Sequence, residues 1–264
     1  MIVFENVDFA YDPRSPFRKD IFQGLSLSFD QGDFHFIIGK NGTGKSTLLQ
    51  LCDALLFPQS GTITVEGLKT NDRKALPKIR QRVGLLFQYP EAFFFGPTVR
   101  DELCFPLKNW KTPVEKWEGR ILRSLEMTGL PREILDRSPF LLSGGEMRLV
   151  AIAAMLVTEP TYVLLDEPTV GLDHAGRKRV REMIRAMLDA GNTVILVAHE
   201  LQLAFDIAYP EPTFHLLEKE RSPKRCRLPQ LLEIEDLEER YGIGFPSLVE
   251  YERIKKGWKR SPVS

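Results

Sequence analysis

The most chemically specific stretch of the sequence is GKNGTGKST, from Gly39 to Thr47. It matches the pattern G-x-x-x-x-G-K-[ST] between an apolar run and a helical pattern, the context in which this motif binds phosphate. Glycines let successive backbone N–H groups point at phosphate oxygens, and the helix start adds partial positive charge. A glycine turn that only caps a helix is the alternative. The residues predicted to hold a nucleotide here are Gly39, Asn41, Gly42, Thr43, Gly44, Lys45, Ser46 and Thr47, with Lys45 on the β and γ phosphates and Ser46 on Mg²⁺.

A second element is YVLLDEP, an apolar strand pattern that ends in Asp166 and Glu167 before Pro168. Two carboxylates at the end of a buried strand are costly unless a cation lies nearby. Beside a phosphate loop, Asp166 is predicted to reach the Mg²⁺ shell, which leaves Glu167 to polarise a water for attack on the γ-phosphate. The pair therefore predicts ATP hydrolysis, and an acidic strand end that faces solvent is the alternative.

A third element is FLLSGGEMR, in which Ser143, Gly144, Gly145 and Glu146 precede an apolar helical pattern. The serine and the glutamate fit a capping box, which would explain them by stability alone. Two glycines, however, weaken a first helical turn by roughly 1 kcal/mol each relative to alanine. Close approach of an anion to the backbone would account for that cost. Because the chain already has a complete phosphate loop, the simplest interpretation is that this second site serves the nucleotide of another subunit.

The elements that position these motifs follow an α/β pattern. Apolar runs such as FHFII and TYVLLDE predict buried strands, whereas the alternating stretch MIVFENVDFAY predicts a half-buried one. Strands that alternate with helices indicate a mostly parallel sheet, here with an antiparallel β subdomain at the start of the chain. The predicted strand segments are 1–11, 25–30, 34–38, 61–67, 82–88, 161–167, 192–199 and 213–218, and helical patterns begin near Lys45, Pro113, Ser143, Asp173 and Glu200.

Two regions depart from this alternation. Between about residues 89 and 159 only helical patterns occur, which predicts a helical subdomain inserted into the core. After about residue 220 the composition shifts to alternating basic and acidic runs, broken by Pro229 and Pro246. The predicted division is therefore a nucleotide-binding domain over 1–220 and a small helical appendix over 221–264.

Composition places the chain among ordinary globular proteins, with 264 residues of which 43% are hydrophobic and 27% charged. Lys and Arg number 36 and Asp and Glu also number 36, so no excess charge indicates nucleic acid as a partner. No apolar run approaches the roughly 20 residues of a membrane span, and no signal peptide is expected. The three cysteines lack metal-site spacing, which favours a reduced, cytoplasmic setting.

In their order, these motifs resemble the nucleotide-binding subunits of ATP-binding cassette (ABC) transporters. The signature L-S-G-G-[QE] is present as Leu142 to Glu146, and the resemblance covers about the first 220 residues. In that family two subunits pack head to tail, so each ATP lies between one phosphate loop and the partner's signature. The resemblance implies a P-loop ABC ATPase fold, ATP and Mg²⁺ as ligands, and a second ABC ATPase subunit as partner.

The resemblance also assigns roles to four further residues. Tyr11 occupies the position of the aromatic residue that stacks on adenine, and Gln88 that of the glutamine that touches Mg²⁺ or the attacking water. His199 corresponds to the switch histidine that contacts the γ-phosphate and holds Glu167. Asp173 corresponds to a residue that makes contact across the two subunits, although it could also simply cap its helix.

The segment LLFQYPEAFFFGPTVRDELCF is similar to the ATPases of energy-coupling factor and cobalt-type importers. This similarity implies an integral membrane coupling subunit as partner, a substrate-binding membrane subunit contacted indirectly, and a peripheral position on the inner face of the membrane. The cluster Phe93 to Phe95 would suit a partner groove, with a buried core edge as the alternative. Ala92 and Phe93 depart from the usual Asp-Gln, and Leu149 and Ala198 depart at two other motif positions.

Three functions remain open on the sequence alone. A transport ATPase leads, and a soluble ABC ATPase that acts on DNA or ribosomes is the alternative. A kinase or GTPase is disfavoured because no N-K-x-D motif occurs and the signature would be unexplained. The transported solute, and the choice between a homodimer and a heterodimer, are not encoded in these motifs.

Overall fold

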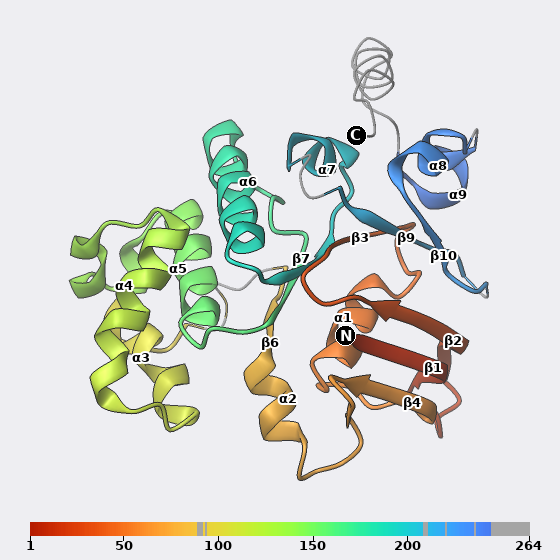
Figure 1. The fold of residues 1–264 in the computed structure, drawn as a ribbon, viewed down its shortest axis with the longest axis horizontal. Coiled ribbons are helices and arrows are strands. Elements are labelled where there is room, and N and C mark those ends of the chain that lie inside the picture. The colour runs from red at the N-terminus through yellow and green to blue at the C-terminus, as the bar shows by residue number, and fades with distance from the viewer. Residues whose placement is uncertain (89–91, 93, 208–210, 220, 235, 244–264) are drawn as a thin grey trace.

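A six-stranded sheet in the order β10-β9-β3-β8-β7-β6 forms the centre of the computed structural model, which describes residues 1–88, 92, 94–207, 211–219, 221–234 and 236–243 (Figure 1). From β9 to β6 the strands run parallel, and β10 pairs with β9 in the antiparallel sense. The strands are β3 (Phe34–Gly39), β6 (Val83–Leu86), β7 (Tyr162–Asp166), β8 (Thr193–Val197), β9 (Thr213–Leu217) and β10 (Lys224–Cys226). The predicted mostly parallel α/β core is thus confirmed.

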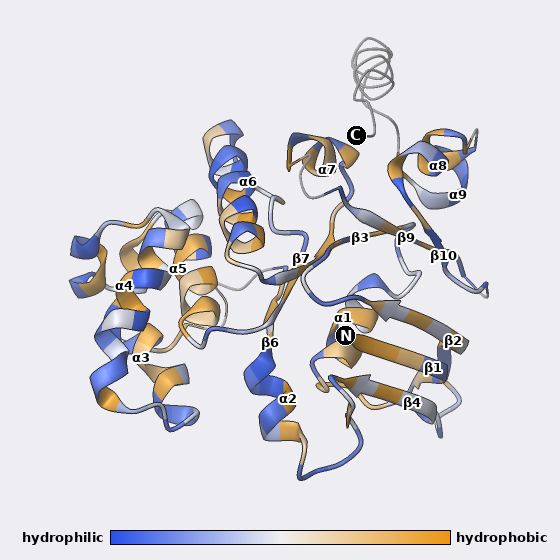
Figure 2. Ribbon diagram, viewed as in Figure 1, coloured by the Kyte–Doolittle hydropathy of each residue, from blue (hydrophilic) through white to orange (hydrophobic). Residues whose placement is uncertain are grey.

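The central strands separate two hydrophobic cores. Successive side chains of a strand point to opposite faces of the sheet. In β3, Phe34 and Phe36 pack into a core shared with the long helices, whereas Ile37 packs into a second core on the other face. Strands buried on both faces read as continuous apolar runs, which is why β3, β7 and β8 were visible in the sequence. Figure 2 shows β7 and β1 as mainly hydrophobic, while α4 and α6 carry both colours, as amphipathic helices do.

The second core lies beneath an antiparallel sheet of order β2-β1-β4-β5. Helix α1, which follows the phosphate loop, contributes Leu48, Leu49 and Leu51 to this core. The antiparallel β subdomain predicted from the alternating stretches is therefore confirmed, and it covers the helix that carries the phosphate loop. Its elements are β1 (Ile2–Tyr11), β2 (Lys19–Phe29), β4 (Ser60–Val65) and β5 (Leu68–Lys69), with α1 spanning Lys45–Cys52.

The helices of the inserted region pack against one another at the far side of the molecule from β1, β2 and β4 (Figure 1). They are α3 (Val99–Asn109), α4 (Trp117–Thr128) and α5 (Gly144–Leu156), joined by short 3₁₀ turns at Val114–Lys116, Arg132–Asp136 and Pro139–Leu141. The sequence analysis singled out α4 and α5 but neither α3 nor α2 (Leu76–Arg82). Both missed helices contain a proline, Pro106 within α3 and Pro77 in the first turn of α2, which obscures a helical pattern.

The remaining helices are α6 (His174–Asp189), α7 (Leu201–Ile207), α8 (Leu228–Leu232) and α9 (Leu237–Tyr241). The predicted appendix contains the two short helices α8 and α9, but it also supplies β10, which the sequence analysis did not foresee. Lys224 and Arg225 are exposed on this edge strand while Cys226 is buried, and charged residues are common on sheet edges. The division at residue 220 stays a prediction. In the described part of the chain, no helix has the length and apolar character needed to cross a membrane.

Candidate functional site: two half-sites for one nucleotide chemistry

The phosphate loop joins the end of β3 to the start of α1. Gly42 and Gly44 have φ values of 82° and 94°, in the left-handed region that favours glycine. A Cβ on Gly44 would also lie 2.6 Å from Ile21 Cγ2 and 2.7 Å from Phe22 Cζ, so the loop presses against β2. Lys45 Nζ donates to the carbonyl oxygens of Gly39 at 2.6 Å and Lys40 at 3.1 Å. The loop therefore has the curled backbone that the glycine spacing predicts, with the ammonium group held over it.

The acidic strand end lies next to this loop. Asp166 is the last residue of β7, and its carboxylate accepts a hydrogen bond from the Ser46 hydroxyl. Burial raises the pKa of Asp166, while the Ser46 hydrogen bond and the charge of Lys45 oppose that rise. Carboxylate and hydroxyl oxygens are hard donors of the kind that Mg²⁺ prefers. Asp166 and Ser46 thus meet at one point, as the predicted metal ligands should.

Glu167 follows the strand in an unusual backbone conformation. Its φ of 52° lies in the left-handed region, which costs a non-glycine residue on the order of 1–3 kcal/mol and is concentrated at functional sites. Its N–H donates to Val197 O at 2.9 Å, which ties the turn to β8. Burial and the neighbouring Asp166 raise the pKa of Glu167 to about 7. A carboxyl group with that pKa can exchange a proton near neutral pH, which suits a general base.

His199 completes this cluster and lies two residues beyond the end of β8, although the sequence analysis placed it in the strand. Its Nε2 lies 2.9 Å from Glu167 Oε1, and its side chain remains 45% exposed. Burial, together with the positive charge of Lys45, lowers the pKa of His199. The ring is therefore neutral at physiological pH, and its Nε2–H can donate to the Glu167 carboxylate.

Tyr11 and Gln88 both line the same hollow. The Tyr11 side chain is 37% exposed, and its hydroxyl lies 3.0 Å from Thr47 Oγ1. The sequence analysis placed Gln88 at the end of a strand, but it lies two residues beyond the end of β6. The hollow has a volume of about 240 Å³, below the roughly 300–1,000 Å³ of enclosed ligand pockets. It is lined by Tyr11, Lys19, Ile21, Asn41, Gly42, Gly44, Lys45, Ser46, Thr47, Gln88, Asp166, Glu167 and His199.

Two of the predicted residues do not line this hollow, and two unpredicted ones do. Gly39 and Thr43 are buried and absent from its lining, and a Cβ on Gly39 would come within 2.6 Å of Thr43 Oγ1. Lys19 and Ile21 reach the hollow because Lys19 pairs with Tyr11 across β1 and β2. The sequence could have indicated these two residues only if the register between the two strands had been known.

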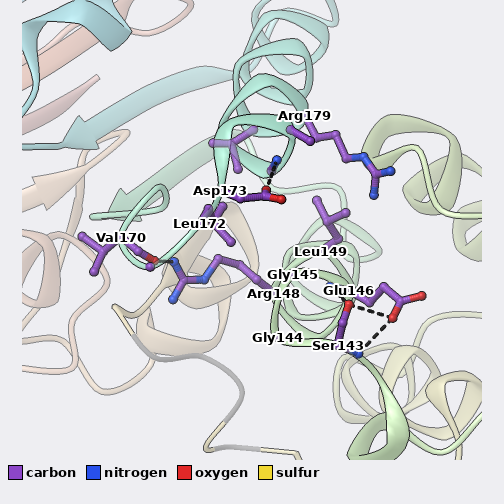
Figure 3. Close-up of a pocket in the computed structure, with 14 residues that line it drawn as sticks. Ser143, Gly144, Gly145, Glu146, Arg148, Leu149, Val170, Leu172, Asp173 and Arg179 are labelled. Carbon is purple, nitrogen blue, oxygen red and sulfur yellow. Dashed lines mark hydrogen bonds between the residues drawn. The ribbon is translucent and has the colours of Figure 1, made fainter.

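The signature motif forms a second hollow, between the first turns of α5 and α6 (Figure 3). Ser143 caps α5 in the predicted capping box: its Oγ accepts from the Glu146 N–H at 3.3 Å, and the Glu146 carboxylate accepts from the Ser143 N–H at 2.9 Å. Gly144 and Gly145 leave the backbone open, since a Cβ at either would contact nothing. Asp173 caps α6 by accepting from the Gly176 N–H at 2.7 Å.

Arg148 and Arg179 also line this second hollow, and the sequence analysis did not single them out. The two hollows share no lining residue among those that the structure describes. One chain therefore carries the glycine-rich loop and the two predicted catalytic acids in one place, and an exposed helix N-terminus with glycines in another. In the described residues no group of three or more His, Cys, Asp or Glu side chains is arranged to hold a metal ion. Mg²⁺ at phosphate sites usually needs only one or two carboxylates besides the substrate.

Comparisons with known proteins agree with this geometry. Residues 22–170 match the family model described as ABC transporter. A curated relative, the energy-coupling factor transporter ATP-binding protein EcfA2 of Symbiobacterium thermophilum, is 44% identical over 201 residues, which are 76% of this chain and 70% of the relative.

Two solved structures are similar over most of the chain. CbiO1 from Clostridium perfringens, described as part of the ABC transporter complex cbiONQ, has a TM-score of 0.75 at 27% identity and covers 99% of this chain and 95% of its own. The ATP-binding cassette MJ0796, as a dimer in a post-hydrolysis state bound to ADP and Pi, has a TM-score of 0.72 at 28% identity. That match covers 85% of this chain and 98% of the MJ0796 chain.

Proposed function

This chain belongs to the ABC transporter family, and from that premise we propose that it is the ATP-hydrolysing subunit of a membrane importer of the energy-coupling factor type. The observation that carries the proposal is the presence, on one chain, of two separate half-sites with complementary chemistry. Action on DNA or ribosomes is not favoured, because the relatives are named as transporter proteins and the net charge is balanced.

The phosphate-loop half-site supplies the chemistry. Loop N–H groups and Lys45 bind the β and γ phosphates, and the adenine ring stacks on the exposed face of Tyr11. Glu167 accepts the proton of the attacking water, and His199 holds the Glu167 carboxylate by the 2.9 Å contact. When bound, Mg²⁺ neutralises charge on the phosphate oxygens, and Ser46, Asp166 and Gln88 are the residues that would hold it.

The signature half-site supplies what the first lacks. The nucleotide hollow is shallow, and the signature presents a helix N-terminus and two bare glycines that can approach a phosphate closely. We infer that two ATPase subunits pack head to tail, so that Ser143, Gly144 and Gly145 of one subunit close over the γ-phosphate bound by the other. The similar ATP-binding cassette MJ0796 is described as a dimer, which supports pairing of two ATPase subunits. The C-terminal segment 221–264 is proposed to help hold the two subunits together.

The membrane partner is proposed to bind beside α3. Phe95 and Phe105 are 59% and 43% exposed, and their rings meet edge to face with centroids 4.5 Å apart. Glu102, which is buried, fixes the loop by accepting from the N–H groups of Phe95 at 2.6 Å and Gly96 at 2.5 Å. Phe94 instead packs against the core, and Phe93 lies outside the described residues. An apolar pair held this rigidly suits a helix of an integral membrane coupling subunit, which would place the chain on the inner face of the cell membrane.

Co-purification tests this proposal. The tagged chain is expressed in its native host, and the membranes are extracted in mild detergent. The proteins that co-purify with the chain are then identified. We expect hydrophobic membrane subunits, and recovery of ribosomes or of no partner would argue for another function. The double variant Phe95→Ser, Phe105→Ser should lose the membrane subunits, whereas Val114→Ser, which alters an apolar residue 70% exposed elsewhere, should retain them.

A further inference from the structure

A single buried guanidinium connects the signature helix to both half-sites of the same chain. Arg148 lies in α5, is 4% exposed, and points away from the helix toward Val170 (Figure 3). Its Nη1 donates to Val170 O at 2.5 Å and to Pro168 O at 3.3 Å, and its Nη2 donates to Gln88 O at 2.9 Å. Among the described residues these three acceptors are backbone carbonyls from two segments far apart in the sequence, so the contacts hold the path of the chain in both segments.

Each of these carbonyls lies in or next to a functional residue. Gln88 is one of the residues that line the nucleotide hollow, and Pro168 directly follows Glu167. Val170 lines the signature hollow together with Asp173. The guanidinium thus hydrogen-bonds the backbone of Gln88, a predicted metal ligand, and that of Pro168, which follows the predicted general base. It also hydrogen-bonds the backbone of Val170 in the second half-site.

We propose that Arg148 is a positioning residue that couples the two half-sites of one chain. Its hydrogen bonds fix the position of α5 relative to the Gln88 backbone and to the turn that follows Glu167. The proposal deepens the proposed function and rests on it, since the two half-sites serve different nucleotides in a head-to-tail dimer. When the dimer closes and the nucleotide bound by the partner contacts Ser143, α5 would shift. Because Arg148 hydrogen-bonds the turn after Glu167, that turn would shift with α5.

Arginine is the side chain that this geometry requires. Its planar fork presents several N–H donors in fixed directions, so one group can reach the Gln88 carbonyl on one side and the Pro168 and Val170 carbonyls on the other. Lysine keeps the charge but concentrates its donors on one nitrogen, which cannot bridge the two segments in the same way. An Arg148→Lys variant therefore retains a buried cation while it removes the bridge.

The turn itself offers a readout that does not depend on hydrolysis. The Val170 N–H donates to Glu167 O at 3.2 Å, and the Leu172 N–H donates to Thr169 O at 3.2 Å. If Arg148 holds this turn, both amides should exchange their hydrogens faster in the Arg148→Lys variant. The matched control is Arg120→Lys in α4, because Arg120 is 22% exposed and pairs with Glu159 at 2.9 Å away from either half-site.

The experiment compares wild type, Arg148→Lys and Arg120→Lys by hydrogen exchange over residues 168–173, by MgATP binding to the isolated chain, by melting temperature and by steady-state ATP hydrolysis. For Arg148→Lys we expect faster exchange in that segment, a nucleotide Kd within about twofold of wild type, and a kcat lower by about tenfold or more. Arg120→Lys should match wild type in each measurement.

Two results would overturn the inference. One is wild-type exchange and wild-type kcat in Arg148→Lys. The other is a loss of nucleotide affinity and melting temperature in proportion to the loss of kcat, which would mark Arg148 as a merely structural residue. If the wild-type chain fails to hydrolyse ATP even in the complex that it forms with its co-purifying subunits, the proposed function fails, while hydrogen exchange still decides whether Arg148 positions the turn.

Discussion

His199 Nε2 lies 2.9 Å from Glu167 Oε1, although the two residues follow different strands and are 32 positions apart in the chain. The contact exists because β7 and β8 are parallel neighbours whose carboxyl ends meet at the same edge of the sheet. Ligands of open α/β sheets bind at that edge. The predicted general base and the predicted switch histidine are therefore brought together by the sheet, beside the predicted phosphate loop.

Replacement of the base is expected to stop turnover without loss of binding. In Glu167→Gln the amide keeps the size and hydrogen-bonding capacity of the side chain but cannot accept the proton of water. We expect kcat to fall about 10²–10⁴-fold, with MgATP affinity retained and a closed dimer trapped, as measured by hydrolysis, binding and gel filtration with ATP. Glu200→Gln, next to His199, is the control. Hydrolysis by Glu167→Gln at the wild-type rate would show that Glu167 is not the base.

The pH profile should report the ionisation of Glu167. With a pKa of about 7, the base is protonated and inactive in acid, so kcat/KM should rise about tenfold per pH unit below 7 and level off above it. Burial lowers the pKa of His199 from its ordinary value, so this ring adds no descending limb at or above neutral pH. The measurement is hydrolysis from pH 5.5 to 8.5 at saturating Mg²⁺, and a flat acid limb would contradict it.

A bulky cation at the signature should act on the partner's site alone. Ser143→Arg fills the space that the facing γ-phosphate needs, so dimer-dependent hydrolysis should fall to background while the isolated chain binds MgATP as before. Asn109→Arg adds the same charge at an exposed position in the same helical region and should hydrolyse ATP normally. Weaker nucleotide binding by the isolated Ser143→Arg chain would show that the signature acts on its own nucleotide.

The adenine contact can be separated from the Tyr11 hydroxyl. Tyr11→Ala removes the ring, and loss of a base–aromatic stack costs about 1–3 kcal/mol, so MgATP affinity should fall by roughly 5- to 150-fold. Tyr11→Phe keeps the ring and loses only the hydroxyl contact with Thr47 at 3.0 Å, so it should bind within about threefold of wild type. Titration of the purified chains measures both, and equal losses in the two variants would exclude stacking.

Acid should destabilise the fold through a buried histidine pair. His35 Nδ1 and His215 Nε2 lie 3.1 Å apart with both rings buried, and burial lowers the pKa of both, that of His215 to about 3. Unfolding frees them to bind protons near their ordinary pKa of 6.5, so the unfolded state binds more protons below that pH. Stability is therefore full above pH 6.5 and falls as the pH drops below it, by up to about 1.4 kcal/mol per pH unit for each histidine.

Urea unfolding at pH 7 and pH 5 measures this loss. His215→Gln should reduce the difference in unfolding free energy between the two pH values, because it removes one of the two buried bases. His174→Gln alters an exposed histidine at the start of α6 and should leave the difference unchanged. Equal pH dependence in wild type and His215→Gln would contradict the assignment.

Much of the fold and of the site was predictable because local patterns determine them. The runs that form β3, β7 and β8 are apolar throughout, and the glycine spacing around Lys45 encodes a loop whose conformation is set by those glycines. The capping box at Ser143 is likewise a relation between residues three positions apart.

What escaped prediction depends on contacts between distant segments. Lys19 reaches the nucleotide hollow only through the register of β1 and β2, and β10 is a strand only because β9 offers an open edge. Arg148 looks like an ordinary helical arginine until α5 is packed against the segments that hold Gln88 and Val170. Side chains of this kind have no local signature, because their partners are backbone groups brought close by the tertiary fold.

The central claim is that each working site combines the phosphate loop of one subunit with the signature of another. Two inactive chains, one carrying Lys45→Ala and the other Ser143→Arg, are given different tags, and dimers that carry both tags are isolated and assayed for ATP hydrolysis. Such a dimer has one site in which both halves are defective and one in which both are intact. We predict that hydrolysis returns in the doubly tagged dimer, and its absence there would contradict the account.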